Sequence, residues 1–316
     1  MSPNSWTCLH PSNATEAKLS LDNRGLAYGD GFFTTMGVID GQILWLDYHQ
    51  QRLVSHATAL QLQLDSQLLL AMLKIHAKQL QQGMLKLIIT RAEQEVRGYG
   101  YTPNTGGGSA CEIWLKSSPM AITTARSLPL ADGQFIPLQP AASAICLSSQ
   151  IACLPPTLAG LKSLNRLDNV LASGELQAIK AKTLADTIKP SIAEGLLRDI
   201  SGHWVEGTMS NVFYQLVEAP VAKSSNRPHS QNNSSNYLTQ GQWYTPSMAQ
   251  SGVAGVMRQV IIDTLSTSNN PVIIRSLQDE DLPHLSQLFF CNALRGIMPM
   301  SSLRLLAGEV VSFEAI

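Results

Sequence analysis

Lys162 is a candidate nucleophile. It lies in the segment 160–167 (GLKSLNRL), directly after the apolar residues 151–160 (IACLPPTLAG), which include no charged side chain. A lysine that is withdrawn from water has a lowered pKa, and its neutral amine can attack a carbonyl carbon. Most lysines are exposed to solvent, so an ordinary surface lysine is the alternative.

Glu206 is a candidate partner for a buried cation. It is the lone acid of the segment 205–213 (VEGTMSNVF), where small polar residues precede an apolar strand. A carboxylate that is held inward needs a partner, and the protonated nitrogen of a pyridine ring would serve. An acid on a turn that faces water is the alternative.

Two further segments could bind a phosphate. The first, 251–258 (SGVAGVMR), leads into an apolar helix, and the free backbone N–H groups at a helix start favour an anion. It lacks the Gly-Lys-Ser/Thr of a Walker A loop and the spacing of a dinucleotide site. The second, 48–53 (YHQQRL), carries Arg52, which could hold a phosphate through two N–H groups. An ordinary glycine turn and a solvated helix arginine are the alternatives.

Together these segments would supply a reactive amine, an acid, a phosphate cradle and an arginine. Pyridoxal 5'-phosphate (PLP) requires this combination. Its aldehyde bonds to a lysine, its ring nitrogen pairs with a carboxylate, and its phosphate needs an anion site.

The pattern around these segments predicts helices and strands without regular alternation, which favours an α+β fold. Asp40-Gly41 between two apolar runs predicts a hairpin over 38–44, and Asp47 is expected to cap the next helix. Helices are expected near 47–60, 67–81 and 165–181 and from Gly255 onward, and Gly83 is expected to stop the second of them. Strands are expected near 84–90, 112–116, 212–217, 242–245, 271–275 and 287–292, with a strand hairpin around 199–203. A linker near 118–125 divides the chain into an N-terminal α/β domain (1–120) and a C-terminal α/β domain (121–316) that carries Lys162.

Composition excludes several classes of protein. The 22 basic and 23 acidic residues give a net charge of -1, which excludes binding to nucleic acid or anionic membranes driven by charge. No apolar run is long enough to span a bilayer, and the N-terminus lacks the features of a signal peptide. Five irregularly spaced cysteines predict free thiols, no metal site and a cytoplasmic location. The Ser/Asn-rich tract 224–236 predicts a surface loop between two strands.

The motifs occur in an order that resembles the class IV aminotransferases, a family of PLP enzymes of fold type IV. The resemblance covers about 20–303 and is carried by 26–35 (LAYGDGFFTT), His49-x-x-Arg52-Leu53, 161–166 (LKSLNR), 206–211 (EGTMSN) and 252–258 (GVAGVMR). Within the family, 31–35 (GFFTT), 162–166 (KSLNR), 97–99 (RGY) and 291–294 (CNAL) most resemble the aminodeoxychorismate lyases. The two-domain fold of that family, as in D-amino acid aminotransferase, is therefore expected.

The resemblance implies a role for each matched residue. Lys162 would bond covalently to PLP and move protons, and Glu206 would pair with the pyridine nitrogen. Thr35 would lie over the cofactor and Arg97 near the substrate carboxylate, so that Lys162 and Thr35 are the implied catalytic residues and Thr35 and Arg97 the implied substrate contacts. The other implied contacts to PLP are Arg52, Asn211, Asn292 and the backbone N–H groups of Val256 and Met257.

The reaction implied by the resemblance is a carbon–oxygen bond cleavage in folate biosynthesis, from 4-amino-4-deoxychorismate to 4-aminobenzoate and pyruvate. A homodimer and a functional link to aminodeoxychorismate synthase are implied with it. A D-amino acid or branched-chain aminotransferase would share every cofactor contact and differ only at substrate positions such as Thr35 and Arg97. A non-catalytic phosphate- or ligand-binding protein, in which Lys162 is structural, is a further alternative.

Overall fold

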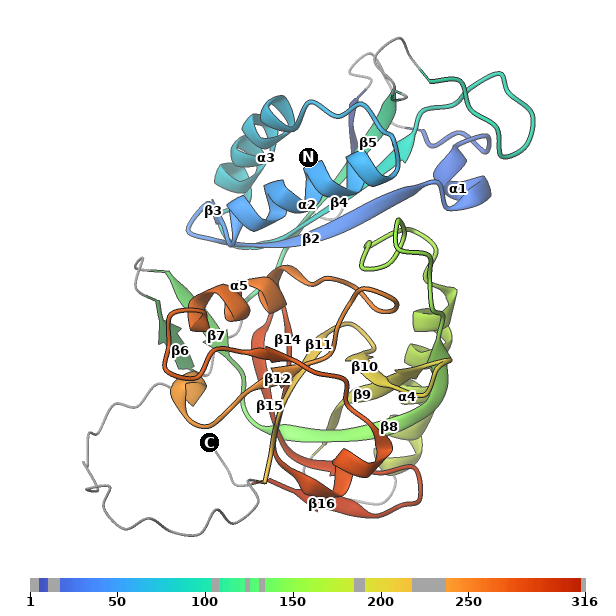
Figure 1. The fold of residues 1–316 in the computed structure, drawn as a ribbon. Helices are drawn as coiled ribbons and strands as arrows, with labels where there is room; N and C mark the ends of the chain where they lie inside the picture. Colours follow the sequence, from blue (N-terminus) through green and yellow to red (C-terminus); the bar gives the residue numbers. More distant parts are fainter. Residues whose placement is uncertain are drawn as a thin grey trace.

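A computed structural model of the protein describes residues 6–10, 18–103, 108, 110–122, 126–130, 134–184, 191–217 and 237–313. These residues form two β-sheets that lie one above the other, each with its own helices (Figure 1). The Ser/Asn-rich tract 224–236 lies outside the described residues. The strands expected on either side of it are present and pair antiparallel, Tyr214 opposite Tyr244.

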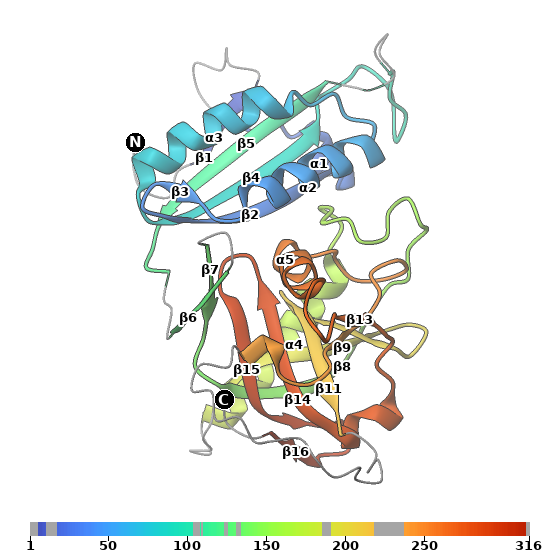
Figure 2. The ribbon, with the colours of Figure 1, turned by 60° about the vertical axis from the view of Figure 1, so that its left-hand side comes forward.

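The first sheet is antiparallel and has the strand order β1-β5-β4-β2-β3. Its strands are β1 (Trp6–His10), β2 (Gly31–Ile39), β3 (Gln42–Ile43), β4 (Gly83–Arg91) and β5 (Cys111–Pro119). Three helices accompany them: α1 (Arg24–Tyr28), α2 (Leu46–Ala59) and α3 (Ser66–Leu80). The helices α2 and α3 cover one face of this sheet (Figure 2).

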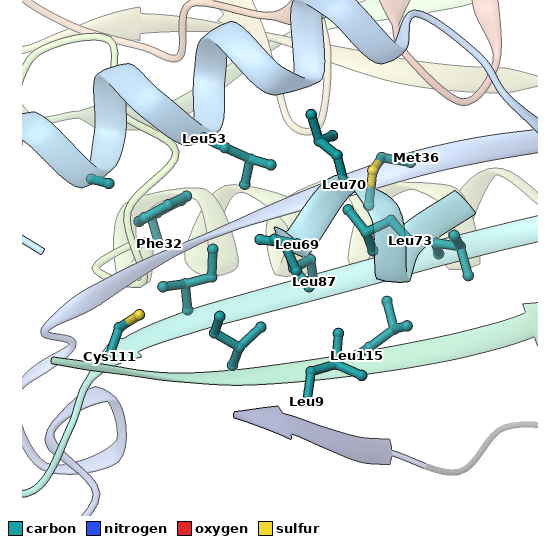
Figure 3. Close-up of a cluster of buried hydrophobic side chains, with 14 of the residues drawn as sticks. Leu9, Phe32, Met36, Leu53, Leu69, Leu70, Leu73, Leu87, Cys111 and Leu115 are labelled. Atoms are coloured by element: carbon teal, nitrogen blue, oxygen red, sulfur yellow. The ribbon is translucent and has the colours of Figure 1, made fainter. Parts of the chain in front are cut away.

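Alternation along β2 sorts its side chains onto two faces. Phe32 and Met36 point into the core between the sheet and the helices α2 and α3, where Leu53 and Leu73 meet them (Figure 3). Thr35 is only partly buried on the opposite face, which is the face turned toward the second sheet (Figure 1). The strand therefore anchors the first core with one face and leaves the other for a site.

The hairpin predicted over 38–44 is confirmed. β2 and β3 pair Ile39 with Gln42, and the two turn residues Asp40 and Gly41 have φ values of 51° and 70°. Positive φ at both positions is the geometry that the Asp-Gly dipeptide favours in a two-residue hairpin.

Both predicted helices beside the first sheet lie within one residue of their expected ranges, but the residues expected to bound them are wrong. α2 begins at Leu46 after Trp45, whose φ is 58°, so Asp47 lies in the first turn and is not the cap. α3 ends at Leu80 with Gln81 at a φ of 60°, whereas Gly83, expected to stop the helix, is the first residue of β4. In both places the residue next to the helix end has a positive φ, which is uncommon for its residue type. The conformational preferences of the residue types therefore do not predict these two helix ends.

The second sheet is mixed and has eleven strands among the described residues, in the order β13-β12-β11-β10-β9-β8-β15-β7-β6, with β14 between β11 and β15 and with β16 beside β15. Its strands are β6 (Arg126–Pro129), β7 (Phe135–Leu138), β8 (Ala142–Ile151), β9 (Ile192–Asp199), β10 (Trp204–Gly207), β11 (Asn211–Leu216), β12 (Tyr244–Thr245), β13 (Ile273–Ile274), β14 (Leu285–Asn292), β15 (Gly296–Arg304) and β16 (Val310–Ser312). The helix α4 (Leu167–Leu184) packs on β8 and β9, and α5 (Val256–Leu265) packs on β14. Two short 3-10 helices, η1 (Tyr237–Thr239) and η2 (Asp279–His284), complete the elements. The predicted α+β class is confirmed.

The connection between the sheets lies where a linker is expected. The first sheet ends at Pro119 and the second begins at Arg126; the division into domains 1–120 and 121–316 stays a prediction. All five cysteines are free. In the described part of the chain, no helix has the length and apolar character needed to cross a membrane.

Candidate active site

The backbone of Lys162 is held against the first sheet from both sides. Its N–H donates to Nε2 of His56 on α2 at 2.9 Å, and its carbonyl accepts the N–H of Phe33 on β2 at 3.0 Å. Leu164 N–H donates in turn to the carbonyl of Gly31 at 3.0 Å. The segment thus lies beside β2 and pairs with it through an isolated antiparallel bridge, Phe32 opposite Ser163, which fixes where the lysine side chain begins.

The amine of Lys162 lies in a poor environment for a charge. Its Nζ is 4.5 Å from the centre of the Phe33 ring, and no carboxylate of the described residues forms an ion pair with it. Burial, together with the nearby charge of Arg52, lowers the pKa of Lys162 to about 8, and the charge of Glu206 opposes that shift. The amine is therefore protonated and neutral in comparable amounts just above neutral pH, as a nucleophile and proton carrier requires.

Glu206 is buried where β10 turns into β11, with 3% of its surface exposed. Its Oε2 accepts the N–H of Val253 at 2.8 Å, and its Oε1 accepts Nδ2 of Asn169 at 3.3 Å. Burial raises the pKa of the Glu206 carboxyl above its ordinary value, although the Val253 N–H opposes that shift. A cation beside the carboxylate would stabilise its charged form, so the site favours a protonated ring nitrogen.

The turn that follows Glu206 is built around a second buried carboxylate. Glu194 on β9 accepts the N–H and the Oγ1–H of Thr208 at 3.0 and 2.6 Å, and the Oγ–H of Ser210 at 2.6 Å. A Cβ on Gly207 would lie 2.4 Å from Ser210 Oγ. These bonds fix the chain between Glu206 and Asn211.

The start of α5 is open to an anion. Its cap residue Gly255 carries no side-chain hydrogen bond for the first N–H groups, which include those of Val256 and Met257. Asn211 packs so closely that a Cβ on Gly255 would lie 1.9 Å from its Oδ1, and Asn211 Nδ2 donates to the carbonyl of Val253 at 2.8 Å. Only glycine fits here, and the helix start keeps free donors that a phosphate can take.

Arg52 reaches the same place from α2 and leaves 7% of its surface exposed. Its Nη2 donates to the carbonyl of Ala254 at 2.7 Å, next to the α5 cap, and its Nη1 lies 3.4 Å from Thr34 Oγ1. Among the described residues, no carboxylate pairs with it, and burial lowers the pKa of Arg52 to about 10. A buried cation without a counter-charge, beside a helix N-terminus, fits a phosphate dianion.

The structure thus brings together six of the predicted cofactor residues: Lys162, Glu206, Arg52, Asn211, Val256 and Met257. Thr35 lies on the same face of β2 as Phe33, whose ring contacts Lys162, and therefore faces the site. Asn292 ends β14 and uses its Oδ1 to accept the N–H groups of Leu294 and Arg295. Arg97 is exposed in the connection between β4 and β5, and among the described residues no hydrogen bond joins it to Lys162.

The residues that hold the predicted ones in place carry no recognisable signal in the sequence. His56 is the clearest case: burial, together with the charge of Arg52, lowers its pKa to about 3, so the ring is neutral and Nε2 can accept the Lys162 N–H. Asn169 and Glu194 play similar parts for Glu206 and its turn. His56 and Lys162 are 106 residues apart, and no motif spacing links them.

Comparison with known proteins identifies the family of the chain. The amino-transferase class IV family model matches residues 31–303, and the chain belongs to that family, whose members depend on PLP. Its two-sheet architecture is the α+β fold of the fold-type-IV enzymes.

Individual relatives carry more specific names. The chain is 24% identical to the aminodeoxychorismate lyase of Vibrio harveyi over 91% of this chain and 88% of that one. It is 30% identical to the 4-amino-4-deoxychorismate lyase from Pseudomonas aeruginosa, whose crystal structure matches with a TM-score of 0.68 over 91% of this chain and 88% of that one. A hypothetical aminotransferase from Mycobacterium tuberculosis in its PLP-bound form matches with a TM-score of 0.63 at 18% identity, covering 94% and 90% of the two chains, and shows the shared fold.

Proposed function

We propose that the protein is a PLP-dependent lyase that converts 4-amino-4-deoxychorismate to 4-aminobenzoate and pyruvate, a step of folate biosynthesis. The observation that carries the proposal is the placement of Lys162. Its side chain is half-buried with Nζ 4.5 Å from the centre of the Phe33 ring, and the charges of Arg52 and Glu206 act on an amine whose pKa is about 8. The choice of substrate is supported by the two relatives named for this reaction, at 30% and 24% identity. Loss of the enolpyruvyl group leaves an aromatic ring, which makes the reaction favourable.

The residues present fit the three recognisable parts of PLP. Arg52 and the N–H groups of Val256 and Met257 would hold its phosphate, and Glu206 would accept a hydrogen bond from its ring nitrogen. Lys162 would bond to its aldehyde carbon. When bound, PLP supplies an electron sink that stabilises negative charge at the amine-bearing carbon of a substrate.

The protein's own groups then divide the work. Nζ of Lys162 takes the proton from the amine-bearing carbon and returns a proton later, which its pKa of about 8 permits near neutral pH. Val253 and Asn169 orient the carboxylate of Glu206, which would stabilise a proton on the ring nitrogen of bound PLP. His56 and Phe33 hold the backbone of Lys162 while its side chain moves.

The direct test is incubation of the purified protein with 4-amino-4-deoxychorismate. The proposal predicts 4-aminobenzoate and pyruvate in equal amounts, and no product from the Lys162→Ala variant. An aminotransferase on this scaffold would instead consume an amino acid and a 2-oxo acid. Transfer of an amino group without release of 4-aminobenzoate would therefore contradict the proposed lyase activity and show that the protein is an aminotransferase.

The proposal extends to the assembly and the supply of substrate. A homodimer is proposed on the resemblance to the family, and an aminodeoxychorismate synthase would supply the substrate. The cytoplasmic location stays a prediction.

A further inference from the structure

We propose that Arg24 is a positioning residue that holds the loop 97–101 beside the Lys162 site. The inference rests on the proposed function in one respect, namely that Arg97 on this loop recognises a substrate carboxylate. Arg24 is not among the residues proposed to bind the cofactor, and its guanidinium bonds to Asp30, Gly98 and Tyr99.

The side chain of Arg24 connects three parts of the chain. Its Nη1 donates to the carbonyl of Gly98 at 3.4 Å and its Nη2 to the carbonyl of Tyr99 at 3.2 Å. Its Nε donates to Oδ2 of Asp30 at 2.9 Å. The two carbonyls belong to the residues directly after Arg97, so the guanidinium fixes the backbone at the point where Arg97 leaves it.

Asp30 ties this guanidinium to a second one. The same Oδ2 accepts Nε of Arg91 at 2.9 Å, and Arg91 donates to the carbonyls of Leu60 and Gln61 after α2 at 2.7 and 3.2 Å. Arg24 and Arg91 are both about 95% buried, and Asp30 is about 85% buried. A carboxylate between two buried guanidinium groups resists displacement, because each lost bond would leave a charge unpaired.

At its far end the loop is held by Tyr101, whose hydroxyl donates to Oε1 of Gln61 and whose ring centre lies 3.8 Å from the guanidinium carbon of Arg91. The end that carries Arg97 has fewer contacts. Arg97 is exposed, and Tyr99 leaves 85% of its surface exposed. The ring of Tyr99 meets only the edge of Tyr28, with the ring centres 5.3 Å apart. A segment with so little buried apolar surface opens readily, so the two bonds from Arg24 are the main attachment of the loop at its Arg97 end.

The loop 97–101 and the Lys162 segment line the same cavity, so the position of the loop affects the site. This cavity has a volume of about 340 Å³ and is lined by Arg24, Tyr28, Tyr99, Ser163 and Asn165 among others. Ser163 directly follows Lys162. Movement of the loop would therefore change the distance between Arg97 and a substrate that reacts at Lys162, which affects binding more than the proton transfers.

The first experiment is limited proteolysis of the holoenzyme with trypsin, which cuts after Arg97. We compare the wild type with Arg24→Lys and Arg24→Met. The lysine can pair with Asp30 but cannot reach both carbonyls, and the methionine can do neither. Loss of one or two hydrogen bonds predicts cleavage after Arg97 about tenfold faster in both variants, because cleavage follows the population of the opened loop. Arg275→Met, which removes another ion-paired arginine away from the site, should leave that rate unchanged.

The second experiment measures steady-state kinetics with 4-amino-4-deoxychorismate. The proposal predicts a KM raised about tenfold in the Arg24 variants, as expected for one lost net hydrogen bond, with kcat and PLP content close to the wild type. Faster cleavage at every tryptic site, with a lower Tm and less PLP, would show a general structural role and overturn the proposal. The Arg24→Lys variant keeps the test valid if Arg24→Met does not fold.

Arg97→Ala separates failure of this inference from failure of the proposed function. If Arg97→Ala raises KM but the Arg24 variants neither raise KM nor speed cleavage, the positioning role is wrong. If the Arg24 variants speed cleavage but Arg97→Ala leaves KM unchanged, Arg97 does not bind the substrate. The proposed role of that residue is then wrong, and the link from Arg24 to substrate binding is overturned with it.

Discussion

Acid should destabilise the protein through two buried histidines of α2. His49 is fully buried and His56 is 5% exposed, and burial, with a contribution from Arg52, lowers the pKa of each to about 3. In the unfolded chain the pKa of histidine is about 6.5. Each group therefore binds its proton mainly after unfolding. The stability it contributes is complete above pH 6.5 and is lost as the pH falls from 6.5 toward 3.

The magnitude follows from the width of that window. One pH unit below the unfolded pKa corresponds to about 1.4 kcal/mol for each group. Between pH 7.5 and pH 5.5, the two histidines should together lower the free energy of unfolding by about 3 kcal/mol. His56→Asn removes one titrating ring but keeps an acceptor for the Lys162 N–H, so it should remove about half of this pH dependence.

The assay is urea unfolding at both pH values, for the wild type, His56→Asn, His49→Asn and the double variant. The difference between variant and wild type isolates the histidine, since carboxylates that titrate in the same range are common to all four proteins. An unchanged pH dependence in His56→Asn would refute the reasoning. It would mean that His56 is not neutral in the folded protein and does not accept the Lys162 N–H as described.

Further predictions concern the proposed cofactor site. Glu206→Gln should weaken PLP binding by about 1.5–3 kcal/mol, the contribution of one charge-assisted hydrogen bond, and should lower kcat by a larger factor. PLP titration measures the affinity and steady-state kinetics measures kcat. Wild-type turnover in this variant would show that the acid is wrongly assigned. Lys162→Ala should lower turnover by about 10⁴ or more, because the nucleophile and the general base disappear together, and Lys162→Arg should be as inactive because a guanidinium keeps its proton. Both variants should bind PLP non-covalently, so that dialysis removes the PLP absorbance. Activity in either variant would count against the role of Lys162. Gly255→Ala should weaken PLP binding by about 1–3 kcal/mol, the range for overpacking, because its Cβ would lie 1.9 Å from Asn211 Oδ1; unchanged affinity would argue against a phosphate at the α5 start. Sedimentation of the active protein should show a homodimer, and an active monomer would contradict that proposal.

Local chemistry made part of the fold predictable. The Asp40-Gly41 turn and the start of α5 after Gly255 follow from backbone preferences that act within a few residues. The predicted cofactor residues were found in the same way, because each belongs to a short motif whose order along the chain is similar to that of a known family.

The residues that position the site were not predictable, because their partners are distant in sequence. His56 meets the Lys162 backbone across 106 residues, and Arg24 meets Tyr99 across 75. A neutral buried histidine and an exposed one look the same in a sequence. The start of α2 shows the same limit, since Trp45 adopts a positive φ that its type does not favour and its ring is buried in the core around α5.

Reduction with borohydride followed by peptide mapping tests the central claim most directly. Purified protein that contains PLP is reduced, which fixes the cofactor on the lysine to which it is bonded, and is then digested and sequenced by mass spectrometry. The account predicts the label on Lys162 alone. Lys86 is a real competitor, because its Nζ lies 5.5 Å from the same Phe33 ring that Lys162 contacts. A label on Lys86, or on any lysine other than Lys162, would contradict both the site and the reaction proposed for it.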